Sequence, residues 1–170
     1  RGLGMVGGSV RARAGREKPR DRLAAVMDDS IRIRVAGSRA DLETCVTLQR
    51  AVWGLSDLEI TSTIQLTSTL HAGGLLHLAE TADGKPVAFA YAFPAIRGGV
   101  AHLHSDMLAV LPGVQERGIG GRLKWAQRED ALRAGVSLIT WNFDPLQARN
   151  ANLNLRRLGG LAMEFLEDFY

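Results

Sequence analysis

The chain has very little cysteine, few aromatic residues and no long apolar run. The single cysteine, Cys45, excludes a disulfide framework and any zinc site built from several cysteines. No apolar run approaches the roughly 20 residues that a membrane-spanning helix needs, so we expect no membrane partner. Aromatic residues make up 6% of the 170 residues, and only Tyr91 and Tyr170 are tyrosines. The composition otherwise predicts one globular, cytoplasmic domain without a metal cofactor.

The excess positive charge lies at the start of the chain. The formal net charge is +3, but residues 1–26 hold seven Arg or Lys against two Asp or Glu. Residues 27–170 hold fourteen and sixteen, so this part is not basic and we do not expect nucleic acid as its partner. We expect residues 1–26 to be a disordered or non-native leader. A basic arm that binds nucleic acid or acidic lipid is the alternative.

Apolar periodicity predicts one domain over residues 27–170. Strands are predicted at 31–35, 75–81, 87–93, 100–110, 137–143 and 161–166, and helices at 38–54, 61–72, 118–134 and 147–158. This order is typical of an α/β (α+β mixed) fold, in which helices pack on a central mixed sheet.

One segment, residues 107–122, combines a strand, a loop of small residues and the start of a helix. A helix start has free backbone N–H groups and the positive end of the helix dipole, which favour an anion. Gly118, Gly120 and Gly121 would let a phosphate approach the backbone without a Cβ in the way. The segment is neither a Walker loop nor a dinucleotide fingerprint, and tight helix packing is the alternative reason for its glycines.

The pattern Gln115-x-x-Gly118-x-Gly120, after Leu108-Ala109-Val110 and Pro112, resembles the acetyl-CoA-binding signature of the GNAT acyltransferase superfamily. The order of elements from Ile31 to about Leu166 is also similar to that superfamily. Residues 141–151 resemble a branch of largely uncharacterised bacterial GNAT proteins.

The resemblance implies a mostly antiparallel sheet and an N-acyltransferase that moves an acetyl or other short acyl group from acyl-CoA to an amine. Small-molecule amines or amino acids are the implied acceptors. The pantetheine arm would pair with the strand, the loop would hold the pyrophosphate, and an asparagine of the last helix would bind the pantetheine or thioester. The implied CoA-binding residues are Leu108, Ala109, Val110, Gln115, Glu116, Arg117, Gly118, Ile119, Gly120, Gly121, Asn150 and Asn154.

A run of polar residues precedes the loop on the same strand. His102, His104 and Asp106 alternate, and Leu108 and Val110 continue the alternation, so all five face one side unless a bulge intervenes. The resemblance implies such a bulge near Leu108. In the superfamily a Glu, Asp or His on this strand often takes the proton of the attacking amine. We expect His104, oriented by Asp106, to be the base or proton relay. Structural histidines at a sheet rim are the alternative.

Two features depart from the superfamily. Many members place a tyrosine acid on the last helix, and that position is Leu155 here. The superfamily core also has one more strand after 161–166, inserted beside 137–143, whereas this chain ends at Tyr170. We therefore expect a sheet that lacks its last strand, through truncation or because a partner chain supplies it. A homodimer is one such arrangement.

Residues 53–72 are expected to select the acceptor. Trp53 and Leu55 offer apolar surface, and Asp57 and Glu59 carry charges that would attract an ammonium group, unless they belong to an ordinary solvated loop. No residue decides between acetyl and a larger acyl group such as succinyl. A non-catalytic acyl-CoA-binding module and, more remotely, a nucleic-acid-binding protein that acts through the leader remain alternatives.

Overall fold

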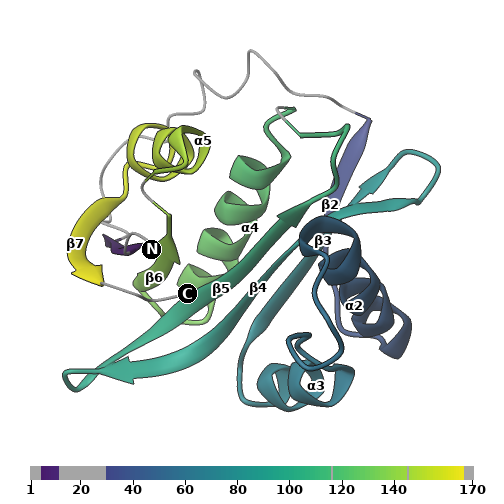
Figure 1. Cartoon of the computed structure of the whole chain (residues 1–170). Helices are drawn as coiled ribbons and strands as arrows, with labels where there is room; N and C mark the ends of the chain where they lie inside the picture. The colour runs from purple at the N-terminus through teal and green to yellow at the C-terminus, as the bar shows by residue number, and fades with distance from the viewer. Residues whose placement is uncertain (1–4, 12–29, 116, 145, 167–170) are drawn as a thin grey trace.

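A seven-stranded sheet organises the protein, as the computed structural model shows for residues 5–11, 30–115, 117–144 and 146–166 (Figure 1). The strand order is β2-β3-β4-β5-β6-β1-β7, and every neighbouring pair is antiparallel except β5 and β6. The strands are β1 (Met5–Arg11), β2 (Ile31–Val35), β3 (Leu75–Thr81), β4 (Pro86–Arg97), β5 (Val100–Val110), β6 (Leu138–Phe143) and β7 (Leu161–Leu166). The predicted mixed, mostly antiparallel sheet is confirmed.

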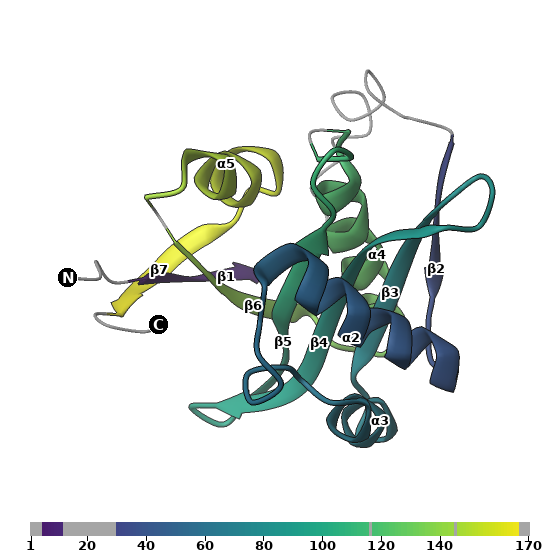
Figure 2. The ribbon, with the colours of Figure 1, turned by 45° about the vertical axis from the view of Figure 1, so that its right-hand side comes forward.

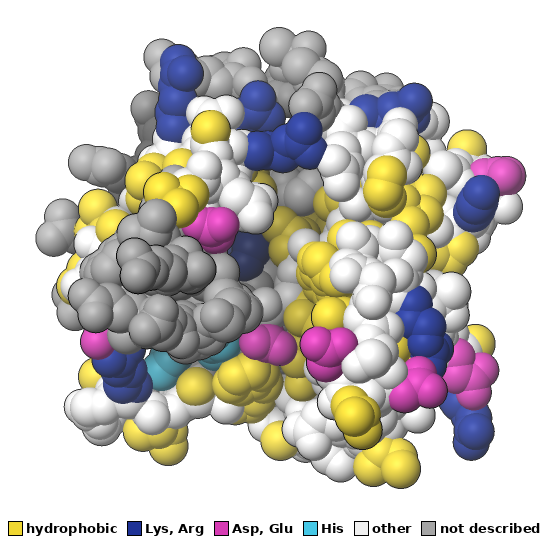
Figure 3. Space-filling view, viewed as in Figure 1, with side chains coloured by type: hydrophobic (Ala, Val, Ile, Leu, Met, Phe, Trp, Pro, Cys, Tyr) yellow, Lys and Arg dark blue, Asp and Glu magenta, His cyan; other side chains and the backbone are white. Residues whose placement is uncertain are grey.

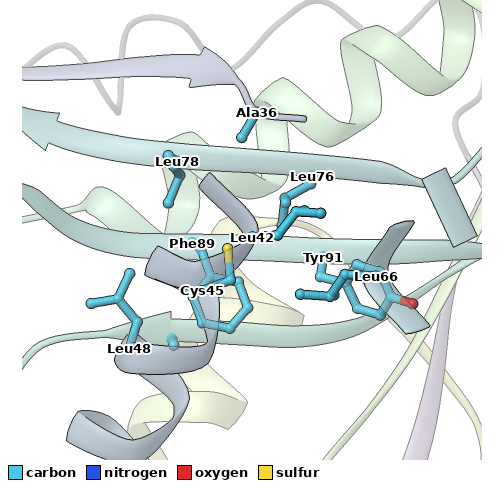
Figure 4. Packing of buried hydrophobic residues seen from close by; sticks show 10 residues of the cluster. Ala36, Leu42, Cys45, Leu48, Leu66, Leu76, Leu78, Phe89 and Tyr91 are labelled. Atoms are coloured by element: carbon cyan, nitrogen blue, oxygen red, sulfur yellow. The ribbon is translucent and has the colours of Figure 1, made fainter. Parts of the chain in front are cut away.

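Helices cover both faces of this sheet (Figure 2). They are α2 (Arg39–Trp53), α3 (Thr63–His71), α4 (Ile119–Arg133), α5 (Ala148–Ala151) and the π-helix η2 (Asn152–Arg157). On one face, α2 and α3 pack on β3 and β4 through buried side chains that include Cys45, Leu66 and Phe89 (Figure 4). On the other face, Ile119 and Leu123 of α4 pack on the sheet. No helix in the described ranges is long and apolar enough to cross a membrane.

The start of α2 is held by both a capping box and an ion-pair network. Ser38 and Asp41 cap each other's backbone N–H groups, and Gly54 ends the helix in the left-handed conformation. Arg34 of β2 bridges Asp41 and Glu80 of β3, each at 2.6 Å. These contacts tie the first helix to the far edge of the sheet, away from the β5 and β6 pair.

The last helix differs in type from the prediction. Only its first turn is α-helical, and it then continues as the π-helix η2, in which the Leu158 N–H donates to the Leu153 carbonyl at 2.9 Å. A π-helix makes hydrogen bonds five residues back, which apolar periodicity does not distinguish from an α-helix over so short a length.

The N-terminal strand β1 lies between β6 and β7, where the sequence predicted no strand. Its register runs from Val6 opposite Phe143 to Arg11 opposite Leu138, and its other edge pairs with β7. Residues 5–11 of the segment expected to be a disordered or non-native leader thus form a strand of the sheet. Without β1, the facing edges of β6 and β7 would expose unpaired backbone donors and acceptors. β1 takes the place that was expected for the missing last strand. The rest of residues 1–26 lies outside the described residues, as does Tyr170.

Candidate functional site

The strands β5 and β6 separate after a short paired region. They pair only at Leu103 with Ile139 and at His104 with Thr140 within the described residues. Beyond His104, β5 continues to Val110 and pairs with β4 on its other side. The edge of residues 105–110 that faces β6 therefore has no strand partner in the described part of the chain. An extended group can hydrogen-bond to such an edge as an added strand does.

The glycine turn lies at the end of this open edge. Gly118 has a φ of 73°, a left-handed conformation that favours glycine, and α4 begins at the next residue. No described side chain caps this helix start, so backbone N–H groups of its first turn are available to an anion. A Cβ on Gly120 would lie 3.4 Å from Leu108 Cδ2 and 3.7 Å from Leu153 Cδ2, so this glycine borders both β5 and the last helix.

The other residues of the predicted CoA site differ in exposure and in the contacts that they make. Gln115 donates to the Val110 carbonyl at 3.1 Å and accepts a hydrogen bond from Arg149, which joins the end of β5 to the start of α5. Arg117 is exposed, whereas the Ile119 side chain is buried at 1% exposure in the core under α4. Ala109 and Gly121 are buried, and Glu116 lies outside the described residues.

The surface is hollowed between the side of the molecule that carries α5 and the side that carries α2 (Figure 3). Lys and Arg side chains gather at the upper end of this hollow, hydrophobic side chains line its middle, and Asp and Glu side chains lie lower down (Figure 3). Such a distribution of charge favours two ligands in the hollow: one with an anionic end at the upper end, and a second with a cationic group at the lower end.

The two asparagines of the last helix differ in exposure. Asn154, on η2, is 5% exposed, and its backbone carbonyl accepts from the Gly160 N–H at 2.8 Å. Asn150 is partly exposed and donates to Gln147 at 3.3 Å. Leu155 is 43% exposed. Tyr91 lies away from this helix, and its hydroxyl donates to Thr69 at 2.8 Å in the core under α3.

The imidazole of His104 sits at the last paired position before β5 and β6 separate. Its Nδ1 lies 2.9 Å from Thr140 Oγ1, and its ring is 5.2 Å from that of Phe93 between centroids. Burial lowers the pKa of His104 below its usual value, and the nearby charges of Lys124 and His102 lower it further. The ring is therefore neutral at neutral pH, as a proton acceptor must be. His102 Nδ1 instead lies 3.0 Å from the Val100 carbonyl of its own strand.

The expected pairing of His104 with Asp106 is wrong, because a bulge interrupts β5. Tyr91 opposes Met107 and Ala92 opposes Ser105, so Asp106 is the extra residue. No hydrogen bond joins His104 and Asp106 in the described part of the chain. Asp106 is exposed by surface area, yet the surrounding protein raises the pKa of its carboxyl, an effect that Lys124 opposes.

The same bulge removes the shared face that His102, His104, Leu108 and Val110 would have on an uninterrupted strand. His104 lies opposite Phe93, which packs on the face of α2 and α3. Leu108 and Val110 pack with Ile119 on the face of α4. The histidine and the leucine of the predicted site therefore lie on opposite faces of the sheet.

Sequence reasoning missed Lys124, a buried lysine of α4. Its Nζ donates to Ser105 Oγ at 2.6 Å and lies 4.8 Å from the Trp141 ring centroid. Burial lowers the pKa of Lys124 to about 7, although the Asp106 carboxylate acts to raise it. The sequence does contain an indication that Lys124 is buried, because positions 120, 124, 127 and 131 form one helical stripe that faces the sheet.

The predicted acceptor loop is held by its own charged groups. Asp57 accepts from Arg50 at 2.7 Å, and Glu59 accepts from the Ser56 N–H and hydroxyl. Trp53 is 42% exposed and packs edge-on against Phe89. No group of three or more His, Cys, Asp or Glu side chains able to hold a metal occurs among the described residues.

Comparisons with known proteins establish the fold. No protein-family model matches the sequence, and no curated protein matches it at a significant level. The structure is similar to an aminoglycoside acetyltransferase from an uncultured soil metagenomic sample, with a TM-score of 0.68, 19% identity, and coverage of 84% of this chain and 96% of that chain.

Two further solved structures are similar. One is a GCN5-related N-acetyltransferase from Sphaerobacter thermophilus, with a TM-score of 0.68, 16% identity, and coverage of 98% of this chain and 51% of that chain. The other is an acetyltransferase from Trypanosoma brucei, with a TM-score of 0.59, 20% identity, and coverage of 79% and 94% respectively. The chain has the fold of the GCN5-related N-acetyltransferases, the GNAT fold.

Proposed function

We propose that this chain is a CoA-dependent N-acyltransferase that transfers an acetyl or other short acyl group to a primary amine. The observation that carries the proposal is the unpartnered edge of β5 at residues 105–110, which leads to the glycine turn at the start of α4. The fold similarity to acetyltransferases supports it.

Acyl-CoA fits the two parts of this site. Its pyrophosphate would lie against the free amides after Gly118, where the helix dipole favours negative charge. Its pantetheine amides would hydrogen-bond to the open backbone edge that ends at Val110. Gly120 lies close to both Leu108 and Leu153, so a side chain there would crowd the end of the open edge. Asn150 and Asn154 of the last helix would bind the pantetheine or the thioester.

His104 is the proposed base. The attacking amine must be neutral, and a neutral imidazole at the point where the strands separate is placed to take a proton from it. The amine nitrogen then forms a bond to the thioester carbonyl carbon, and the bond from that carbon to sulfur breaks. The thiolate leaves without a tyrosine acid at position 155, which is tolerable because a thiolate is a stable leaving group near neutral pH.

A small-molecule amine or an amino acid is the proposed acceptor. One similar structure is an aminoglycoside acetyltransferase in complex with sisomicin, which supports the amine class without extending its substrate to this chain. Acidic side chains in the lower part of the hollow would favour a cationic acceptor (Figure 3). A module that binds acyl-CoA without turnover is the second candidate, and the leucine at position 155 favours it.

The test follows thiol release from acetyl-CoA with a panel of primary amines. Gly118→Ala strains the left-handed residue at the start of α4, and Gly135→Ala strains a similar residue beyond its end, at φ values of 73° and 78°. The proposal predicts thiol release that only Gly118→Ala reduces strongly, although both variants lose similar stability. Equal activity loss in both variants would contradict the assignment of the glycine turn. Binding without thiol release would support the non-catalytic module.

A further inference from the structure

A pocket lies between α4 and β6, on the face of the sheet opposite His104. Its lining includes Lys124, Trp125, Gln127, Ile139, Trp141 and Leu158. Lys124, Gln127 and Arg128 are the polar or charged side chains of the lining, all three come from consecutive turns of α4, and the lining contains no carboxylate.

Buried N–H groups without acceptors concentrate at this pocket. Four buried side-chain nitrogens lack a hydrogen-bond partner in the described part of the chain, and three belong to the lining: Trp125 Nε1, Gln127 Nε2 and Trp141 Nε1. Gln127 is 0% exposed and Trp141 is 5% exposed. A buried donor without an acceptor costs stability, so three of them around one pocket favour the binding of a group that supplies acceptor atoms.

Lys124 adds a cation to these donors. Its Nζ donates to Ser105 Oγ at 2.6 Å, and Ser105 donates its own proton to Gln127 Oε1 at 2.8 Å. This chain of hydrogen bonds uses the Gln127 oxygen and leaves its NH₂ group for another acceptor. Asp106 is the carboxylate whose charge acts on Lys124, but no hydrogen bond joins the two in the described residues.

The pocket begins where the open edge of β5 begins. Ser105 follows His104, the last β5 residue paired with β6, and Trp141 follows Thr140, the partner of His104. A pantetheine arm that runs along β5 from Val110 toward Ser105 would therefore direct its acyl group toward Lys124 and Trp141. The lining offers this acyl group several donors and a cation rather than a purely apolar wall.

We propose that this pocket binds the carboxylate at the far end of a short dicarboxylic acyl group, so that the preferred donor is an acyl-CoA such as succinyl-CoA. The inference rests on the proposed function and names its donor class. The Lys124 ammonium, the Gln127 amide and the Trp141 indole would hold the carboxylate. The reaction is the same transfer: the amine nitrogen bonds to the thioester carbon, the carbon–sulfur bond breaks, and the amine proton passes to the base.

The experiment compares succinyl-CoA with butyryl-CoA, which has the same chain length without the carboxylate, and with acetyl-CoA. We expect kcat/KM for succinyl-CoA to exceed that for butyryl-CoA by about tenfold or more, as one charge-assisted hydrogen bond would provide. Lys124→Met should lower the ratio of kcat/KM for succinyl-CoA to kcat/KM for butyryl-CoA to about one. Lys85→Met, which removes an exposed cation from the turn between β3 and β4, should leave the preference intact.

A conservative variant covers the case in which Lys124→Met does not fold. Trp141→Phe keeps an aromatic ring and removes only the indole N–H, and it should reduce the preference for succinyl-CoA severalfold. Equal kcat/KM for succinyl-CoA and butyryl-CoA in the wild-type chain would overturn the inference. The proposed function would still hold if the enzyme transfers the acetyl group of acetyl-CoA. Failure of all three donors to bind would instead contradict the proposed function itself.

Discussion

His104 Nδ1 lies 2.9 Å from Thr140 Oγ1, across the last pair of residues that joins β5 to β6. This contact fixes the imidazole at the point where the two strands separate. It also replaces the pairing with Asp106 that the alternating sequence predicts. Thr140 is therefore the residue that positions the proposed base.

Replacement of His104 tests its role as the base. His104→Ala should lower kcat by about 100-fold or more, the usual contribution of a positioned general base, with little change in acyl-CoA affinity. His102→Asn is the matched control on the same strand, since His102 contacts its own backbone, and its kcat should stay close to wild type. Steady-state kinetics with a fixed amine measure both. An unchanged kcat in His104→Ala would exclude His104 as the base.

The pH dependence of turnover follows from the lowered pKa of His104. A base whose pKa is depressed remains unprotonated to lower pH, so the acidic limb of His104 in the kcat profile should lie below the ordinary histidine value of about 6.5. Thr140→Val removes the hydroxyl contact and should shift this limb as well as reduce kcat. A Thr140→Val profile identical to wild type would argue against a positioning role for Thr140.

Lys124 should make stability depend on pH above neutrality. Its pKa is about 7 in the folded chain and about 10.4 when unfolded, so the unfolded state binds more protons between these values. The free energy of unfolding should therefore rise with pH from about 7 toward 10 through this group. Lys124→Met should lose that rise. Denaturant titrations of the wild-type chain and of Lys124→Met between about pH 7 and pH 10 measure this difference. If the free energy of unfolding depended on pH in the same way in both proteins, the buried state of Lys124 would be contradicted.

Asp41 should contribute stability that is lost in acid. Arg34, through its hydrogen bond, holds the pKa of Asp41 well below its ordinary value, and the Gly37 and Ser38 N–H groups also lower it. This contribution to stability is present above about pH 3.9, the ordinary pKa of an aspartate, and is lost as the pH falls below that value. Asp41→Asn should cost about 1–3 kcal/mol at neutral pH.

The control for Asp41→Asn is Glu43→Gln. Glu43 pairs with Arg39 on the exposed surface of the same helix, so its replacement should change the free energy of unfolding by less than about 0.5 kcal/mol. Urea titrations at neutral pH compare the two. Equal losses in both variants would indicate that the Asp41 network contributes no more than a surface ion pair.

The strand β1 should be protected from hydrogen exchange. Its backbone pairs with β6 on one side and with β7 on the other, so amides of residues 6–10 should exchange slowly, as those of an interior strand do. Amide exchange followed by mass spectrometry on the full chain measures this. Exchange of residues 5–11 at the rate of an unstructured peptide would contradict the placement of β1 in the sheet.

Local patterns predicted most of the fold. Alternation at Ile31, Ile33 and Val35, the cap at Ser38 and the left-handed Gly54 located β2 and α2, because each signal depends on neighbouring residues. The pairing of residues 5–11 depends instead on strand edges more than a hundred residues away. The glycines at positions 7 and 8 gave that segment little strand propensity.

The site was predictable in part. The glycine turn before α4 was visible because glycines, a preceding strand and a following helix are neighbours in the chain. A bulge near Leu108 was expected only from the resemblance, because the residues themselves do not show which of them is the extra one. One extra residue, Asp106, is enough to place Leu108 and His104 on opposite faces. Lys124 was missed because a lysine on a helix is ordinarily exposed, and only the packing of α4 on β5 and β6 buries it.

Calorimetric titration of the full chain with acetyl-CoA is the most direct test of the proposed acyl-CoA site. We expect saturable binding to one site, strongly weakened in Gly118→Ala and retained in Gly135→Ala, because the glycine turn and the open edge of β5 form that proposed site. Absence of binding in a folded sample, with acetyl-CoA or with succinyl-CoA, would contradict it.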